Sequence, residues 1–278
     1  MSDRSQVDRD DGSPSQGGNQ PVQQGSAQQQ GQPVGQQGQP VGQQPRRDAG
    51  SDIPLKEGAV FGAGGVVITY LTHLYLTVAA AAQSTPLAYA DGETTVVTDL
   101  VPSWVGAGWS YLATFGVGFE ASGEVATLSA APNNVAALTN SPFALASTTL
   151  FVVTVGTLVA AGYGIARYAD ADDPVEAAKA GLTVVPPYVV FALLAAFLMS
   201  HTYSDQALVE QIINSVGTLE AEQFVTDGQI SGEIDFGPAL TDAVLFAGIV
   251  FPAVFAVLGA MLSQGQSAVD SVVGRISG

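Results

Sequence analysis

Four long apolar stretches without a charged side chain dominate the chain after its first fifty residues. They lie at about 58–82, 144–166, 180–201 and 243–263. A helix rises 1.5 Å per residue, so about 20 apolar residues cross the roughly 30 Å of hydrocarbon in a bilayer. Uncharged runs of this length are not a feature of soluble cores. The pattern therefore predicts four transmembrane helices.

A fifth uncharged stretch, residues 100–119, is less uniform. It contains four Gly, one Pro and two Trp, and Trp104, Leu112, Phe115 and Phe119 fall near one face at helical spacing. Because Trp and Tyr favour the headgroup region, this stretch predicts an interfacial or re-entrant helix against the outer leaflet. The alternative is a fifth span.

The placement of charge decides between four and five spans. All eight basic residues lie in 1–57, 167–179 and the C-terminal tail, whereas the segments 83–143 and 202–239 carry twelve carboxylates and no basic residue. Basic residues near span ends stay on the cytoplasmic side. A fifth span would place Arg167, Lys179 and Arg275 outside. We therefore predict a protein of the cytoplasmic membrane with four spans and both termini inside.

The two outer loops have local patterns of their own. The sequences VVTDLV and EVATL in 83–143 resemble strands. In DQALVEQIINSV the apolar side chains share one helix face, and FVTDGQISGEIDF is typical of a hairpin turning at Asp227-Gly228. These loops predict an acidic extracellular cap on an all-α membrane bundle.

The N-terminal segment, residues 1–52, is of low complexity. Gly, Gln, Ser, Pro and Asp dominate it, and GQPVGQQ occurs at 31–37 and again at 38–44. Such a segment has too little apolar area to offset the entropy of ordering it. We predict a disordered cytoplasmic tail followed by a membrane domain, 53–278.

The charge balance is strongly acidic. The chain has 25 acidic and 8 basic residues, a net charge of −17, and only two lysines, Lys56 and Lys179. A carboxylate surface repels itself in dilute buffer, and concentrated salt screens that repulsion. The composition is typical of salt-loving archaea, and it argues against nucleic acid as a partner.

The residue types exclude several kinds of chemistry. The chain has no Cys and only two His, so disulfides, thiolate catalysis, iron–sulfur clusters and Cys- or His-rich metal sites are ruled out. No phosphate loop, dinucleotide fingerprint, zinc-protease motif or nucleophile elbow occurs. We expect no catalytic, cofactor-binding or metal-ligating residues, and hence no enzyme.

His73 is the one ionisable candidate inside a predicted span. It lies near Thr69, Tyr70, Thr72 and Tyr75. An ionisable group at membrane depth suggests a proton shuttle or the lining of a polar path. The alternative, a neutral imidazole hydrogen-bonded to a neighbouring helix, is favoured because no span core contains Asp, Glu, Lys or Arg.

Prolines and small residues supply the remaining candidates. Pro186, Pro187 and Pro252 lie within spans three and four, where a proline frees backbone carbonyls and favours a helix break or kink. Small residues recur every fourth position, which indicates close helix packing, either within the chain or between subunits. They are Gly156, Ala160 and Gly164 in span two, and Gly248, Pro252, Ala256 and Ala260 in span four.

The ends of two helices carry capping signals. Thr241 or Asp242 is a candidate N-cap for span four, and Asp173 or Pro174 begins the helix that leads into span three.

The layout resembles haloarchaeal multi-pass membrane proteins of uncharacterised families. The resemblance rests on the Gln/Gly/Pro-rich tail, on KEGAVFGAGGVVITYLTHLYL at 56–76 and on SWVGAGWSYLATF at 103–115, and it covers roughly 55–278. It implies membrane residence and supplies no site residues.

Two functions fit these observations. The first is a non-enzymatic membrane protein with a structural, accessory or interaction role, whose partners are the lipid bilayer and a second membrane protein or another copy of the chain. The second is a subunit of a transporter or channel, which would act as an oligomer or with a partner because four apolar spans hardly enclose a pathway alone.

Overall fold

The computed structural model describes residues 53–83, 88–91, 94–97, 101–133, 135, 138, 143, 145–226, 229–230 and 232–276. All of them belong to one compact unit, Ser51–Gly278. The predicted tail, 1–52, lies outside the described residues.

The described chain is mostly helical, and four of its helical segments are long and apolar enough to cross a membrane. The first is α1 (Leu55–Gln83) and the second is α3 (Ala146–Tyr168). The third consists of α4 (Pro174–Leu182) and α5 (Val185–Leu198). The fourth runs through α7 (Leu240–Asp242), the π-helical η4 (Ala243–Val250) and α8 (Phe251–Ile276). About two thirds of each apolar window is not buried by protein, which leaves a wide apolar surface for lipid.

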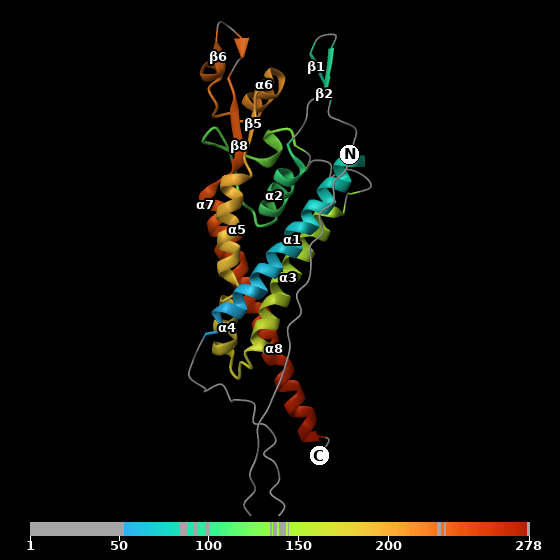
Figure 1. Ribbon diagram of the computed structural model, residues 1–278, viewed down its shortest axis with the longest axis vertical. Helices are drawn as coiled ribbons and strands as arrows, with labels where there is room; N and C mark the ends of the chain where they lie inside the picture. Colours follow the sequence, from blue (N-terminus) through green and yellow to red (C-terminus); the bar gives the residue numbers. More distant parts are fainter. Residues whose placement is uncertain are drawn as a thin grey trace, which may run out of the picture. The chain divides into compact units, whose positions relative to one another are not determined.

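These helices pack as a bundle around small residues. α1 lies against α3 and α5, α3 and α4 lie against α8, and α5 lies against η4, as can be followed in Figure 1. Large side chains on the outer surface include Val67, Leu71 and Tyr75 of α1, of which Tyr75 is 71% exposed.

The segments between the spans form the cap, which we define as the described parts of 83–143 and 199–239. Its centre is an antiparallel sheet in the order β4 (Glu124–Ala126), β3 (Phe119–Ala121), β8 (Ile234–Pro238), β5 (His201–Tyr203). Two short hairpins also occur, β1 (Ala88–Asp91) with β2 (Thr94–Val97), and β6 (Val225–Thr226) with β7 (Gln229–Ile230). The predicted helical bundle is therefore present, and the cap adds a small sheet to it.

The sheet has one buried and one exposed face. Phe119, Ala121, Ile234 and Phe236 point to the buried side, whereas Glu120, Asp235 and Thr202 are exposed. This period-two alternation is what a half-buried antiparallel sheet requires. The strand-like EVATL contains β4, and the predicted hairpin contains β6 and β7 on either side of 227–228.

Short helices complete the cap. α6 (Gln206–Ser215) begins at Asp205, whose carboxylate accepts hydrogen bonds from the N–H groups of Ala207 and Leu208. Its apolar face is buried, as the sequence predicted, and comprises Leu208, Val209, Ile212 and Ile213. Single 3-10 turns occur at η1 (Leu128–Ala130) and η3 (Ala221–Phe224).

The fifth uncharged stretch forms α2 (Ser103–Thr114). At 12 residues it is about 18 Å long, too short to span a bilayer, so the fifth-span alternative is wrong. Residues 105–112 are all buried, because α2 packs against α1, α3, α5 and β8. It is inserted among the helices rather than laid flat on a leaflet. Trp104 was expected on the apolar face but is 47% exposed in the first turn, and Trp109 is the buried tryptophan.

Candidate functional site

A line of polar side chains runs along the inward face of α1. Thr69, His73 and Thr77 are spaced four residues apart, which places them on one helix face, and none of them is exposed. We call these three residues the α1 polar seam. The surrounding helices are almost entirely apolar, so the seam concentrates the polar chemistry of the bundle interior.

His73 bridges three helices. Its Nδ1 lies 2.9 Å from Ser110 Oγ of α2, and its Nε2 lies 3.3 Å from Thr154 Oγ1 of α3. A neutral imidazole has one donor and one acceptor nitrogen, and each hydroxyl can serve either role. The two contacts therefore satisfy the ring without placing a charge in the apolar interior.

Three buried hydroxyls around the seam have no hydrogen-bond partner among the described residues. They belong to Thr77, Tyr111 of α2 and Tyr188 of α5. The Tyr111 hydroxyl lies near the side chains of Thr69 and Tyr188 but forms no hydrogen bond with either. Thr69 Oγ1 instead lies 2.7 Å from the carbonyl oxygen of Gly65. An unsatisfied buried hydroxyl costs about 1–3 kcal/mol.

Aromatic rings enclose the seam on the α2 and α5 side. The Tyr111 ring meets those of His73, Phe115 and Phe191 edge-on, with centroid separations of 5.5, 5.1 and 5.0 Å. These contacts hold the Tyr111 ring in place.

Pro186 and Pro187 follow a break in the third span. α4 ends at Leu182 and α5 begins at Val185, with the prolines in its first turn. Proline has no N–H, so the carbonyls of Leu182 and Thr183 cannot receive their usual helical bonds. Gly58 and Gly62 of α1 pack against this break, and a Cβ at Gly62 would overlap the carbonyl oxygen of Val184.

Pro252 lies just after the π-helical segment, near the start of α8, and is buried. The fourth span passes through it without a break. Pro187 lies away from His73, because it adjoins Gly62, which is eleven residues and about 16 Å from His73 along α1.

The small residues of span four lie in tight helix crossings. A Cβ at Gly162 of α3 would overlap the carbonyl oxygen of Ala256, and one at Gly259 would overlap that of Val159. Gly248 lies against Val189 and Ala192 of α5.

The span-two stripe behaves differently. Gly156 and Ala160 are exposed, with open space at Gly156, so this part of the stripe does not pack within the bundle, and its packing between subunits stays a prediction. Gly162, on another face of α3, makes the contact with α8 instead.

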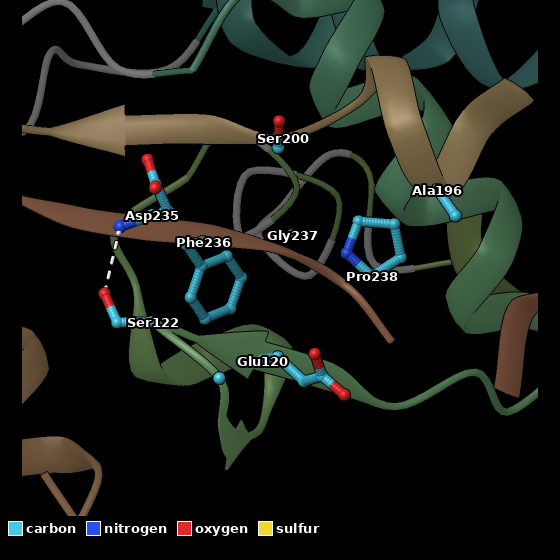
Figure 2. A pocket seen from close by; sticks show the side chains of 9 residues that line it. Glu120, Ser122, Ala196, Ser200, Asp235, Phe236, Gly237 and Pro238 are labelled. Carbon is cyan, nitrogen blue, oxygen red and sulfur yellow. Dashed lines mark hydrogen bonds between the residues drawn. The ribbon is translucent and has the colours of Figure 1, made fainter. Parts of the chain in front are cut away.

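The cap carries a shallow groove on the exposed side of the sheet. Figure 2 shows Glu120, Asp235, Ser200 and Pro238 around it, with the amide of Asp235 bonded to Ser122 Oγ at 3.3 Å. Asp235 Oδ1 also accepts a 2.6 Å hydrogen bond from Thr202. Within the described residues, no three His, Asp or Glu side chains gather as metal ligands would.

The capping predictions have different outcomes. Asp173 caps α4, accepting hydrogen bonds from the N–H groups of Val175 and Glu176, and Pro174 is the first helical residue. Span four begins at Leu240 after Ala239, so Thr241 and Asp242 are not N-caps. Asp242 faces the cap instead and accepts a 3.2 Å hydrogen bond from the N–H of Gly118.

One comparison with known proteins gives a match. A family model, described as a family of unknown function (DUF7978), matches residues 38–267, which is most of the chain. The chain belongs to DUF7978. No curated protein and no solved structure matches it.

In this DUF7978 chain, sequence reasoning found His73 but missed its surroundings. Ser110, Tyr111, Thr154 and Tyr188 reach the seam from three other helices, and nothing local in the sequence marks them. The four-residue spacing of Thr69, His73 and Thr77 was a usable signal, because it predicts one polar face on an otherwise apolar helix.

Proposed function

We propose that this DUF7978 protein is a multi-pass protein of the cytoplasmic membrane of a salt-loving organism, with a non-enzymatic structural, accessory or interaction role. The observation that supports it is the contrast between the outer surface of the bundle and its interior. The outside of the four long helices is apolar, and the inside is packed so closely that glycines meet the backbone of the neighbouring helix.

Close backbone packing suits a scaffold. The α3–α8 crossing leaves no space for a side chain at Gly162 or Gly259, and the α1–α5 crossing leaves none at Gly62. An aqueous pathway needs a lining of side chains with room for water. These crossings supply rigidity and favour a structural or interaction role.

The orientation follows from charge. Basic side chains gather at the N-terminal approach to α1 and at the junction of α3 and α4, where Arg167 and Lys179 lie. The cap sequence, by contrast, is acidic and carries no basic residue. Because basic residues are retained on the cytoplasmic side, this distribution supports an orientation with both termini inside and the cap outside.

Single-cysteine labelling tests both membrane residence and orientation, because the chain has no native Cys to give background. Glu222→Cys places a thiol in the cap, and Asp172→Cys places one between α3 and α4; both positions are exposed. With a membrane-impermeant maleimide on intact cells, we expect labelling at position 222 only, and labelling at 172 after permeabilisation.

The reverse labelling pattern would overturn the orientation. Recovery of the full-length protein in a high-speed supernatant without detergent would overturn membrane residence itself.

A second candidate, a transporter or channel subunit, is favoured by the α1 polar seam. Its buried hydroxyls and imidazole are the polar groups that a proton or small polar solute would need inside the bundle. The chain would work as an oligomer, for which the exposed Gly156 and Ala160 on α3 offer a flat helix face.

Proteoliposomes containing a pH-sensitive dye test the second candidate. A proton flux through wild-type protein that His73→Leu abolishes would favour transport over the scaffold. Equal leakage through wild-type, His73→Leu and protein-free vesicles would leave the scaffold as the better proposal.

A further inference from the structure

We propose that the bundle contains a bound-water site where the hydroxyls of Tyr111 and Tyr188 meet the α1 polar seam. The occupant is water, held between α1, α2 and α5. The inference concerns the interior of the bundle and does not depend on the orientation or role proposed above.

The geometry brings both hydroxyls to one face of α1. The hydroxyl oxygen of Tyr188 lies 2.5 Å from the position that a Cβ on Gly65 would occupy. Only because residue 65 has no side chain can this hydroxyl lie so close to α1. Tyr111 interacts with Thr69, one turn further along α1, and with Tyr188 itself. The two hydroxyls thus approach Gly65 and Thr69, which are adjacent on the helix surface.

The hydroxyls need a partner that the described residues do not provide. Tyr111 is fully buried and Tyr188 is 1% exposed, and neither hydroxyl finds a hydrogen bond among the described residues. The Thr69 hydroxyl donates to the Gly65 carbonyl, and it forms no hydrogen bond with either tyrosine hydroxyl. Buried water typically makes about three hydrogen bonds to groups of this kind.

The choice of tyrosine supports a bound partner. Phe115 and Phe191 pack directly on Tyr111, so the surroundings already accept phenylalanine rings. A phenylalanine at 111 would keep these ring contacts, and a phenylalanine at 111 or 188 would avoid an unsatisfied hydroxyl. Tyrosine carries no such penalty if water bonds to its hydroxyl.

The sign of a stability change tests the proposal on the full-length protein in detergent or nanodiscs. Removing a dry, unpaired hydroxyl raises the melting temperature, whereas removing one that binds water lowers it. We expect Tyr111→Phe and Tyr188→Phe each to lower Tm by about 2–4 °C. Tyr75→Phe is the matched control, since Tyr75 is exposed on the same bundle, and we expect no change.

The double variant tests whether the two hydroxyls share the water. With a shared site, the second substitution costs less than the first, so Tyr111→Phe/Tyr188→Phe falls short of the sum of the single effects. An increase in Tm for both single variants would overturn the proposal.

An infrared measurement covers the case in which a variant fails to fold. Wild-type protein transferred to D₂O should exchange the tyrosine O–H groups in the folded state if water reaches them. Buried tyrosine O–H bands that persist unexchanged until unfolding would overturn the proposal.

Discussion

Gly162 of α3 lies against the carbonyl oxygen of Ala256 in α8, and Gly259 of α8 lies against the carbonyl oxygen of Val159 in α3. The two helices run in the same direction, because Gln264 Nε2, further along α8, donates to the carbonyl of Ala171 just after α3, and their backbones touch where they cross. In a lipid bilayer the hydrophobic effect does not drive helices together, because lipid tails are as apolar as the side chains. Close van der Waals contacts of this kind are then a main source of helix association.

This crossing predicts opposite outcomes for two glycines of the same helix. Gly162→Ala should destabilise the protein by about 1–3 kcal/mol, because the new methyl group overlaps a backbone oxygen that cannot move alone. Gly156→Ala should be neutral or stabilising by up to about 1 kcal/mol, since Gly156 has open space and alanine is the better helix former. Thermal unfolding in one detergent measures both, and equal effects would contradict the packing described.

The His73 bridge predicts a measurable energetic coupling. His73→Leu leaves the Ser110 and Thr154 hydroxyls without their imidazole partner, at about 1–3 kcal/mol for each hydroxyl that stays unsatisfied. In a double-mutant cycle with Ser110→Ala, we expect an interaction energy above about 0.5 kcal/mol.

Thr72→Val is the control for this cycle, because the Thr72 hydroxyl is exposed and bonds only within its own helix, to the Ile68 carbonyl at 2.8 Å. We expect its effect to add independently to that of His73→Leu. Strict additivity between His73 and Ser110 as well would mean that the bridge is not formed.

Asp242 predicts a link between the fourth span and the cap. Asp242→Ala removes the acceptor for the Gly118 N–H and should cost about 1–2 kcal/mol. Asp242→Asn keeps an oxygen acceptor and should cost less. Limited proteolysis of the cap, read as the cleavage rate before global unfolding, measures the difference, and identical rates for all three proteins would refute the link.

His201 predicts a pH dependence of the cap. Partial burial lowers the pKa of His201 below its usual value, so the folded cap binds a proton less readily than the unfolded chain does. The contribution to stability is therefore fully present above the unfolded pKa of about 6.5 and is lost as the pH falls below it. The Tyr203 ring, 4.7 Å away, contributes to that burial.

The measurement compares wild type with His201→Gln between about pH 7.5 and pH 5.5, a range in which few carboxylates titrate. We expect the Tm of the wild type to fall further than that of the variant. Parallel curves would show that His201 does not contribute to the pH response.

The sequence by itself determined the features that depend on local pattern. Uncharged runs of sufficient length predicted the four long helices, because hydropathy and helical rise are properties of a single segment. Three further features also depend on residues only a few positions apart. They are the amphipathic face of α6, the hairpin of β6 with β7, and the helix N-cap at Asp173.

Only the tertiary structure decided which segments meet. β3 pairs with β8, with Phe119 opposite Pro238, across more than a hundred residues, and no local signal specifies that partner. The same holds for Gly162 rather than Gly156 at the α3–α8 crossing, and for the hydroxyls that surround His73. Packing between helices that are far apart in the sequence depends on complementary shape across the whole bundle. The hydrophobic periodicity of a single segment indicates only which of its faces turns inward.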